Sequence, residues 1–199
     1  MKISKQELIN LHACERGIER FIEQTNNTDD LVDVAGLVGG LNNYSDLIWL
    51  ASKKLPKERI IRFACDCALL NIEKIEQYTD NYEFIVEFLR NPSAHGARPA
   101  YAYAAAAYTA ADAAEAAAFA YAYDSYARRS ASAYSAVYAA RVARSAARVA
   151  RASSAGAALT IDATDAAYAA DDSANDAADT VDGRNEVNKL LIAMFNEYE

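Results

Sequence analysis

The stretch from Tyr101 to Tyr123 reads YAYAAAAYTAADAAEAAAFAYAY, and it decides the fold class. Alanine accounts for 45 of the 199 residues, and 37 of these alanines lie between residues 100 and 180. Alanine has the highest helix propensity, because a helix costs it no side-chain entropy. The chain has only 7 Gly and 3 Pro, too few for the many turns of a β-sandwich or barrel. We therefore predict an all-α protein.

The alanine-rich region divides the chain into two parts. We expect an N-terminal helical subregion over residues 1–98 and an Ala/Tyr-rich helical subregion over residues 99–199. Residues 100–155 contain no Gly and no Pro, and one straight helix of that length would span about 84 Å. Such a helix is too long for a compact domain, so we predict breaks at the serines of residues 124–135 and at residues 153–156. The whole chain is expected to form a single helical bundle domain with a long Ala-rich C-terminal half.

Local signals place the helices of the N-terminal part. Ser4 with Glu7 matches a capping box, which predicts a helix that continues to Asn26 and Asn27. The acidic start at Thr28 predicts a second helix, and Ser45 with Asp46 predicts a third. Pro56 ends the third helix or begins a fourth that runs to about Tyr78, and Phe84 to Leu89 belong to a fifth.

Fewer signals mark the helices of the C-terminal part. Thr160 or Asp162 is expected to begin a helix that Gly183 ends. Asn185 then caps a last helix, whose apolar face carries Val187, Leu191 and Phe195.

Charge is distributed unevenly along the chain. Residues 1–99 hold 12 Lys or Arg and 15 Asp or Glu, residues 100–151 hold 6 and 3, and residues 152–199 hold 2 and 10. The net charge of −8 argues against a non-specific nucleic-acid binder, because such proteins are usually basic.

Two helix faces collect these charges. The basic face carries Arg141, Arg144, Arg148 and Arg151, spaced by three or four residues. The acidic face carries Asp165, Asp172, Asp176 and Asp179, with Asp162 near its edge. The two rows could pair with each other or face solvent. Alternatively, one row is an interaction surface, and an acidic row could even imitate the phosphate spacing of DNA.

Tyrosine and arginine are most concentrated just before and within the basic row. The group consists of Tyr126, Arg128, Arg129, Tyr134 and Tyr138. Most tyrosines of the Ala-rich part are expected to fill the core. Because Tyr and Arg dominate interface hot spots, this group and the Arg141 to Arg151 row form our predicted partner-binding surface. A nucleotide or single strand stacked on these rings is an alternative.

The sequence contains no recognised catalytic or metal-binding motif. Cys65 and Cys67 are two positions apart on a predicted helix and point in different directions, so we interpret them as buried structural cysteines rather than zinc ligands. His12 is expected on a helix and His95 in a loop, with no accompanying motif. We predict no enzyme activity, no metal and no cofactor.

The chain has no apolar leader and no long apolar stretch, so we expect a cytoplasmic protein that does not enter membranes.

Residues 45–78 carry a family resemblance. Asp46-Leu47-Ile48-Trp49-Leu50, a short basic linker with Pro56, and Arg62-Phe63-Ala64-Cys65-Asp66-Cys67-Ala68 resemble the alanine-rich immunity proteins of bacterial polymorphic toxin systems. The resemblance implies an all-helical, non-enzymatic protein that binds and neutralises a toxin or related effector in the cytoplasm. A small acidic phage protein that blocks a host defence complex fits the same features. The alternatives are a structural homo-oligomer and a nucleotide-binding sponge.

Overall fold

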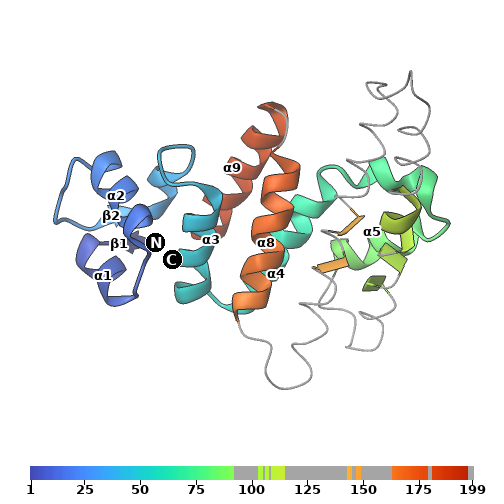
Figure 1. Ribbon diagram of the computed structural model, residues 1–199, viewed down its shortest axis with the longest axis horizontal. Coiled ribbons are helices and arrows are strands. Elements are labelled where there is room, and N and C mark those ends of the chain that lie inside the picture. Colours follow the sequence, from blue (N-terminus) through green and yellow to red (C-terminus); the bar gives the residue numbers. More distant parts are fainter. Residues whose placement is uncertain are drawn as a thin grey trace.

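The computed structural model describes residues 1–91, 103–104, 106–107, 109–114, 143–144, 147–148, 163–178 and 181–196. Helices dominate these residues, and the sheet among them consists of two strands of two residues each, which confirms the all-α prediction (Figure 1). The breaks predicted at residues 124–135 and 153–156 lie outside the described residues.

The N-terminal segment folds as two short helices instead of the one predicted. Ser4 caps α1 (Lys5–Asn10) as expected, its hydroxyl accepting the Glu7 amide at 3.2 Å. The chain then turns at His12, whose φ of 61° lies in the left-handed region, so the prediction of a helical His12 is wrong. A second helix, α2 (Glu15–Gln24), starts at Cys14, whose Sγ accepts the Gly17 amide at 3.4 Å.

The segment after α2 is extended, and the helix predicted from Thr28 is absent. Asn26 and Asn27 do end α2, both with positive φ. The Thr28 hydroxyl accepts the Asp30 amide at 3.2 Å, a local bond that competes with helix formation. Strand β2 (Val32–Asp33) then pairs antiparallel with β1 (Lys2–Ile3), with Lys2 opposite Asp33, and the 3₁₀ helix η1 (Val34–Leu37) follows.

The next helices follow the sequence signals more closely. Helix α3 (Tyr44–Lys54) begins at Asn43 rather than Ser45, and Asn43 forms a reciprocal capping box with Asp46. Pro56 directly precedes α4 (Lys57–Leu69). Of the two predicted alternatives, the one in which Pro56 begins a fourth helix is therefore confirmed. Asn71 leaves the helical conformation with φ −134°, so α4 is shorter than predicted. The 3₁₀ helix η2 (Ile72–Tyr78) and α5 (Tyr82–Arg90) complete this part.

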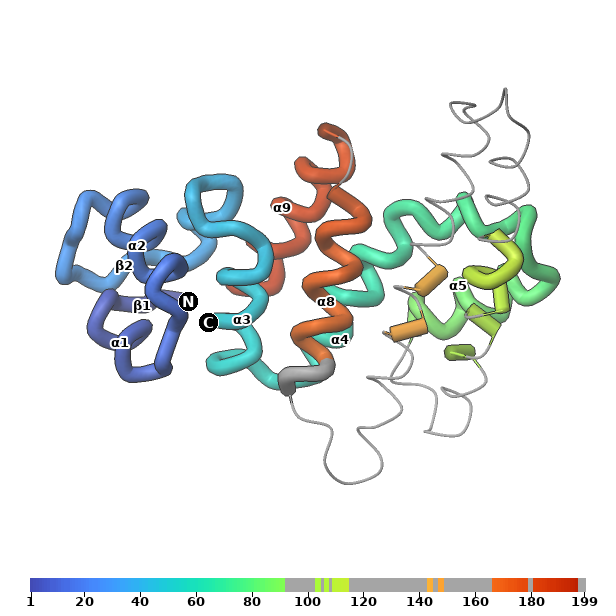
Figure 2. Tube along the Cα trace, viewed as in Figure 1, coloured from blue at the N-terminus to red at the C-terminus, as the bar shows by residue number. Residues whose placement is uncertain are grey.

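The C-terminal helices return to the middle of the molecule. They are α8 (Ala163–Ala177) and α9 (Val181–Asn196). Gly183 lies in the first turn of α9 and does not adopt the positive φ typical of a helix end, so the predictions that it ends a helix and that Asn185 caps the next are wrong. Figure 2 shows these late residues running beside α3 and α4, which lie within the first 69 residues of the chain.

Among the described helices α4 is the most enclosed, because α3, α5, α8, α9 and η2 all contact it. The buried positions of α4 therefore lie on more than one side of the helix. Both Cys65 and Cys67 are at most 1% exposed, which confirms the prediction that they are buried. At the far end, Tyr103 fills the core by stacking on Phe84 and lying against Phe88, with ring centroids 3.9 and 4.5 Å apart.

Helix α8 packs against α3 and α4 through a face of very small side chains. The buried positions recur every three or four residues, and none is larger than serine. They are Ala166, Ala169, Ala170, Ser173, Ala174 and Ala177. Small side chains let helix axes approach to the short end of the usual 8–10 Å range. This face therefore fixes how far α8 lies from α3 and α4.

The close packing of α8 leads to a stability prediction. Substituting Ala170→Leu introduces three carbons where no side-chain atom is exposed, and overpacking of this kind lowers the free energy of unfolding by about 1–3 kcal/mol. The matched control, Ala113→Leu at an exposed helical position, is expected to change it by less than about 0.5 kcal/mol. Urea unfolding followed by circular dichroism measures both, and equal effects would contradict the tight interface.

Candidate binding site

Two hollows meet at Trp49 on α3. The first lies between the α1–α2 turn and α3, and has a volume of about 310 Å³. Its wall is mainly apolar and includes Leu8, Phe21, Leu37, Leu47 and Leu50. The polar members of the wall are His12, Cys14, Asn42, Ser45 and Asp46. A cavity of this size and composition is typical of a site for an apolar group.

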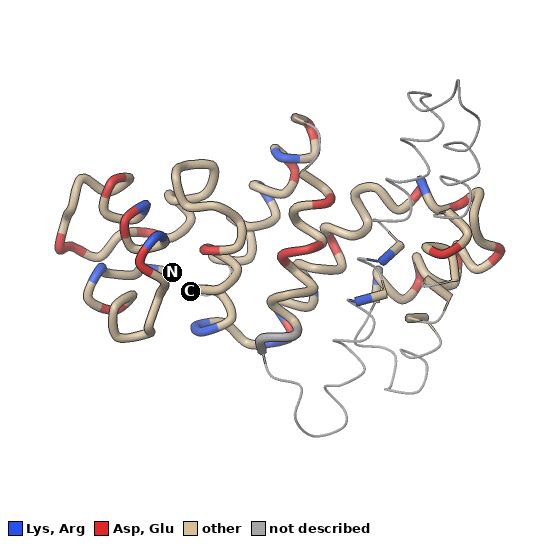
Figure 3. Tube along the Cα trace, in the orientation of Figure 1, with Lys and Arg blue, Asp and Glu red and all other residues tan. Residues whose placement is uncertain are grey.

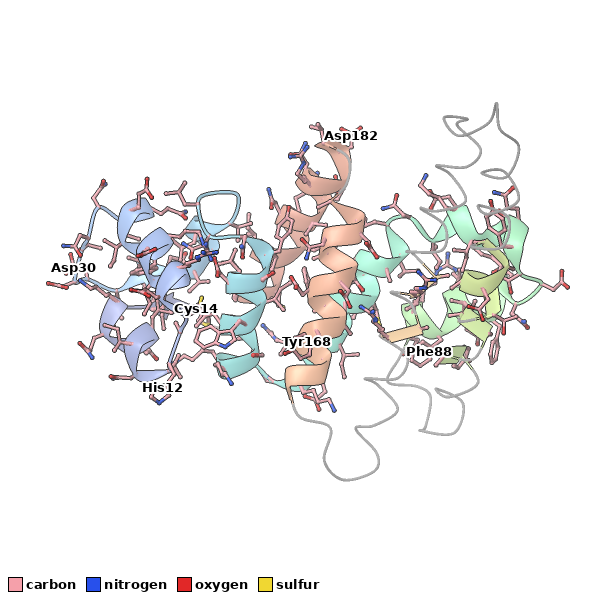
Figure 4. The ribbon with its side chains drawn as sticks, in the orientation of Figure 1. His12, Cys14, Asp30, Phe88, Tyr168 and Asp182 are labelled. Atoms are coloured by element: carbon pink, nitrogen blue, oxygen red, sulfur yellow. The ribbon has the colours of Figure 1, made fainter. Side chains whose placement is uncertain are left out.

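The second hollow is a groove between α3 and α8, with a volume of about 350 Å³. It is lined by Ser45, Ile48, Trp49, Ser52, Lys53, Ala167, Tyr168 and Asp171. Ser45 and Trp49 belong to both hollows, so the two form one continuous surface around the Trp49 ring. In the view of Figure 4, Cys14 and Tyr168 lie on either side of α3.

The helix period places the groove residues in line. Ser45, Trp49 and Lys53 are four residues apart on α3 and therefore share one face. The Ser45 hydroxyl donates to the Asp171 carboxylate at 2.8 Å, which fixes that end of the groove against α8. Lys53 lies eight residues later, about 12 Å along the helix, so the groove has an acidic end and a basic end.

Asp46, the carboxylate in the wall of the apolar cavity, is paired with Arg20 on α2. The Arg20 guanidinium donates two hydrogen bonds of 2.7 Å to the two carboxylate oxygens of Asp46. These hydrogen bonds, with the attraction of the Asp46 charge, raise the pKa of Arg20. Gly17 allows α2 to approach this pair, since a Cβ there would lie 3.2 Å from Asp46 Oδ1. An incoming apolar group therefore meets no unpaired charge from Asp46.

The charged groups of the groove are different. Asp171 accepts hydrogen bonds from Ser45 at 2.8 Å and from the Asn175 amide at 2.9 Å, but it has no cationic partner among the described residues. Lys53 Nζ lies 6.0 Å from the centre of the Trp49 ring. Among the described residues, no carboxylate forms an ion pair with Lys53. Tyr168 is 66% exposed beside them.

The predicted basic and acidic rows are only partly described. Arg148 pairs with Asp172, as expected if the two rows are neighbours, and Arg144 also has an interaction partner. Asp176 is half-buried and partnered as well. Figure 3 shows acidic positions along α8. Residues Tyr126, Arg128, Arg129, Tyr134, Tyr138, Arg141, Arg151, Asp162 and Asp179, and the side chain of Asp165, lie outside the described residues.

Sequence reasoning did not single out the groove residues Trp49, Lys53, Tyr168 and Asp171 as a site. Two signals were present. Ser45, Trp49 and Lys53 share a helix face, and Tyr168 is the single aromatic residue of α8. Neither signal shows that α3 and α8 are neighbours, because more than 100 residues separate them.

The cysteines give no sign of catalytic chemistry. Burial raises the pKa of the Cys65 and Cys67 thiols, so both stay protonated and poorly nucleophilic. Cys14 is exposed.

Within the described part of the chain, no three His, Cys, Asp or Glu side chains lie close enough together to hold a metal ion. No helix in that part is both long and apolar enough to cross a membrane.

The burial of the cysteines predicts their reactivity. In the native protein an aromatic disulfide reagent should modify Cys14 within minutes, while Cys65 and Cys67 react only after unfolding in urea. The absorbance of the released thiolate measures the number modified. Cys14→Ser should abolish the fast phase, and a native protein that releases two or three equivalents rapidly would contradict the described packing of α4.

Comparison with family models, with curated proteins and with solved structures finds no match to this chain.

Proposed function

We propose that this chain is a non-enzymatic binding protein that neutralises a toxin or defence effector by covering its surface. The observation that carries the proposal is the continuous surface around Trp49, where an apolar cavity adjoins a groove with an exposed tyrosine. Tryptophan and tyrosine beside an apolar pocket are the typical centre of a protein–protein interface. The resemblance of residues 45–78 to immunity proteins supports the same proposal, since Trp49 belongs to that stretch.

The chemistry of the site favours binding over catalysis. Asp46, the carboxylate that lines the apolar cavity, is engaged with Arg20 and with the start of α3. Asp171 is hydrogen-bonded to Ser45 and Asn175. We propose no cofactor and no turnover, and a protein partner in the cytoplasm. The arginine row from Arg141 to Arg151 remains a second candidate surface.

Affinity capture tests the proposal. The tagged chain should retain one bacterial protein in a stoichiometric complex, and the double variant Trp49→Ala/Tyr168→Ala should lose it, because it removes both rings of the groove. Val181→Ala is the matched control, since Val181 is 67% exposed but lies outside both hollows. Mass spectrometry identifies the retained protein, and light scattering gives the mass of the complex.

Two results would overturn parts of this proposal. The double variant could still retain the bacterial protein while the triple variant Arg141→Glu/Arg144→Glu/Arg148→Glu loses it. That result would assign the binding surface to the arginine row instead. No retained protein, together with a discrete homo-oligomer of the 21.6 kDa chain, would replace the inhibitor with an assembly protein.

A further inference from the structure

We propose that the groove between α3 and α8 receives an arginine side chain from a segment of the partner protein, with its guanidinium paired to Asp171 and its plane against Tyr168 and Trp49. This inference rests on the proposed function, since it names the group that a protein partner would present. Three observations support the inference: the acidic end of the groove, the exposed aromatic ring and the charge of the whole chain.

The first argument is charge complementarity at Asp171. Asp171 and Asp172 are neighbours on α8, yet they differ in their partners. Asp172 pairs with Arg148, whereas Asp171 has no cationic partner among the described residues. Its carboxylate is held in place by Ser45 and Asn175, so its position is set before a partner arrives. Both of these hydrogen bonds end on Oδ1, so Oδ2 is the oxygen left to accept a charge-assisted hydrogen bond from a guanidinium.

The second argument is the aromatic surface beside that carboxylate. Tyr168 lies one helical turn before Asp171, and both line the groove with Trp49. The Trp49 ring already attracts a cation within the chain, since Lys53 Nζ lies 6.0 Å from its centre. Guanidinium groups stack on aromatic rings better than ammonium groups do, because they are planar and more weakly hydrated. Arginine therefore fits this groove better than lysine.

The third argument is the charge of the chain. Its net charge is −8, and residues 152–199, which include α8, carry ten acidic and two basic residues. This field steers basic segments toward the molecule. Lys53 opposes such a segment locally, but it lies at the other end of the groove, about 12 Å along α3. The guanidinium is thus directed to the Asp171 end.

The apolar cavity adds a second requirement for the partner segment. Because Trp49 forms part of both hollows, a segment that places arginine in the groove can place an apolar side chain in the 310 Å³ cavity. The proposed occupant is therefore a protein segment with an arginine and a large aliphatic residue close together. Free arginine lacks the second group and should bind much more weakly.

Trp49 is the only tryptophan of the chain, so its fluorescence reports on this surface alone. The probes are alanine-based peptides of twelve residues, each with one leucine and one arginine three, four or seven positions apart. Matched peptides carry citrulline, the neutral isostere of arginine. At least one arginine peptide should change the Trp49 emission saturably, and its citrulline partner should bind at least tenfold more weakly.

Variants assign the effect to the groove. Asp171→Asn should reduce the affinity for the arginine peptide to that of the citrulline peptide. Asp182→Asn removes the same charge from the first turn of α9, outside the groove, and should leave the preference intact. Lys53→Ala should raise the affinity a few-fold, because it removes the competing cation.

The outcomes separate this inference from the proposed function. Equal binding of arginine and citrulline peptides, no fluorescence change with any peptide, or equal loss in Asp171→Asn and Asp182→Asn would overturn the arginine site. Arginine amide that binds as tightly as the best peptide would overturn the protein segment as occupant. A captured partner that still binds Asp171→Asn at full affinity would leave the binding function standing and remove this contact.

Discussion

The packing of the small-residue face of α8 against α3 and α4 is the constraint on which the rest of the described structure depends. Its buried positions carry only alanine and serine, so the three helices come close together without large interlocking side chains. Larger apolar side chains are buried on other helices, among them Phe21 on α2 and Phe88 on α5. If α8 lay farther out, Ser45 could not bond Asp171 and the groove would have no second wall.

The candidate surface combines two electrostatic environments on either side of one indole ring. On one side, Arg20 and Asp46 satisfy each other and the cavity presents mainly carbon. On the other side, the described residues leave a carboxylate and an ammonium group without ionic partners. Exposed ion pairs add little stability, about 0–1 kcal/mol each, so folding gains little from pairing these two groups. Their value lies in selecting and orienting a partner.

The sequence predicted the elements whose signals are local. Pro56 and the asparagines at 26 and 27 gave correct helix limits, and the apolar spacing of α4 gave its buried face. Helix geometry indicated that Cys65 and Cys67 point in different directions, but both are buried because other helices contact α4 on several sides. The break at His12 was missed because a histidine with positive φ has no strong local signature. The region after Thr28 was missed because side-chain bonds and pairing with β1 outweighed its helix-start pattern.

The candidate site was the least predictable part, and for a clear physical reason. Trp49 and Asp171 each look ordinary in sequence, one on an amphipathic helix and one among many acidic residues. The groove exists only because a late helix packs beside an early one. Spacing rules describe a single helix face, whereas this surface needs two faces whose pairing is decided by packing over a long sequence separation.

That separation also sets an order of events during synthesis. Residues of α3 and α4 leave the ribosome long before α8, with almost 100 residues between Leu69 and Ala163. At a translation rate of about 5–20 residues per second, the delay is roughly 5–20 s. Throughout this time α3 and α4 lack their contacts with α8. A message cut short before α8 would yield a product without the second wall of the groove.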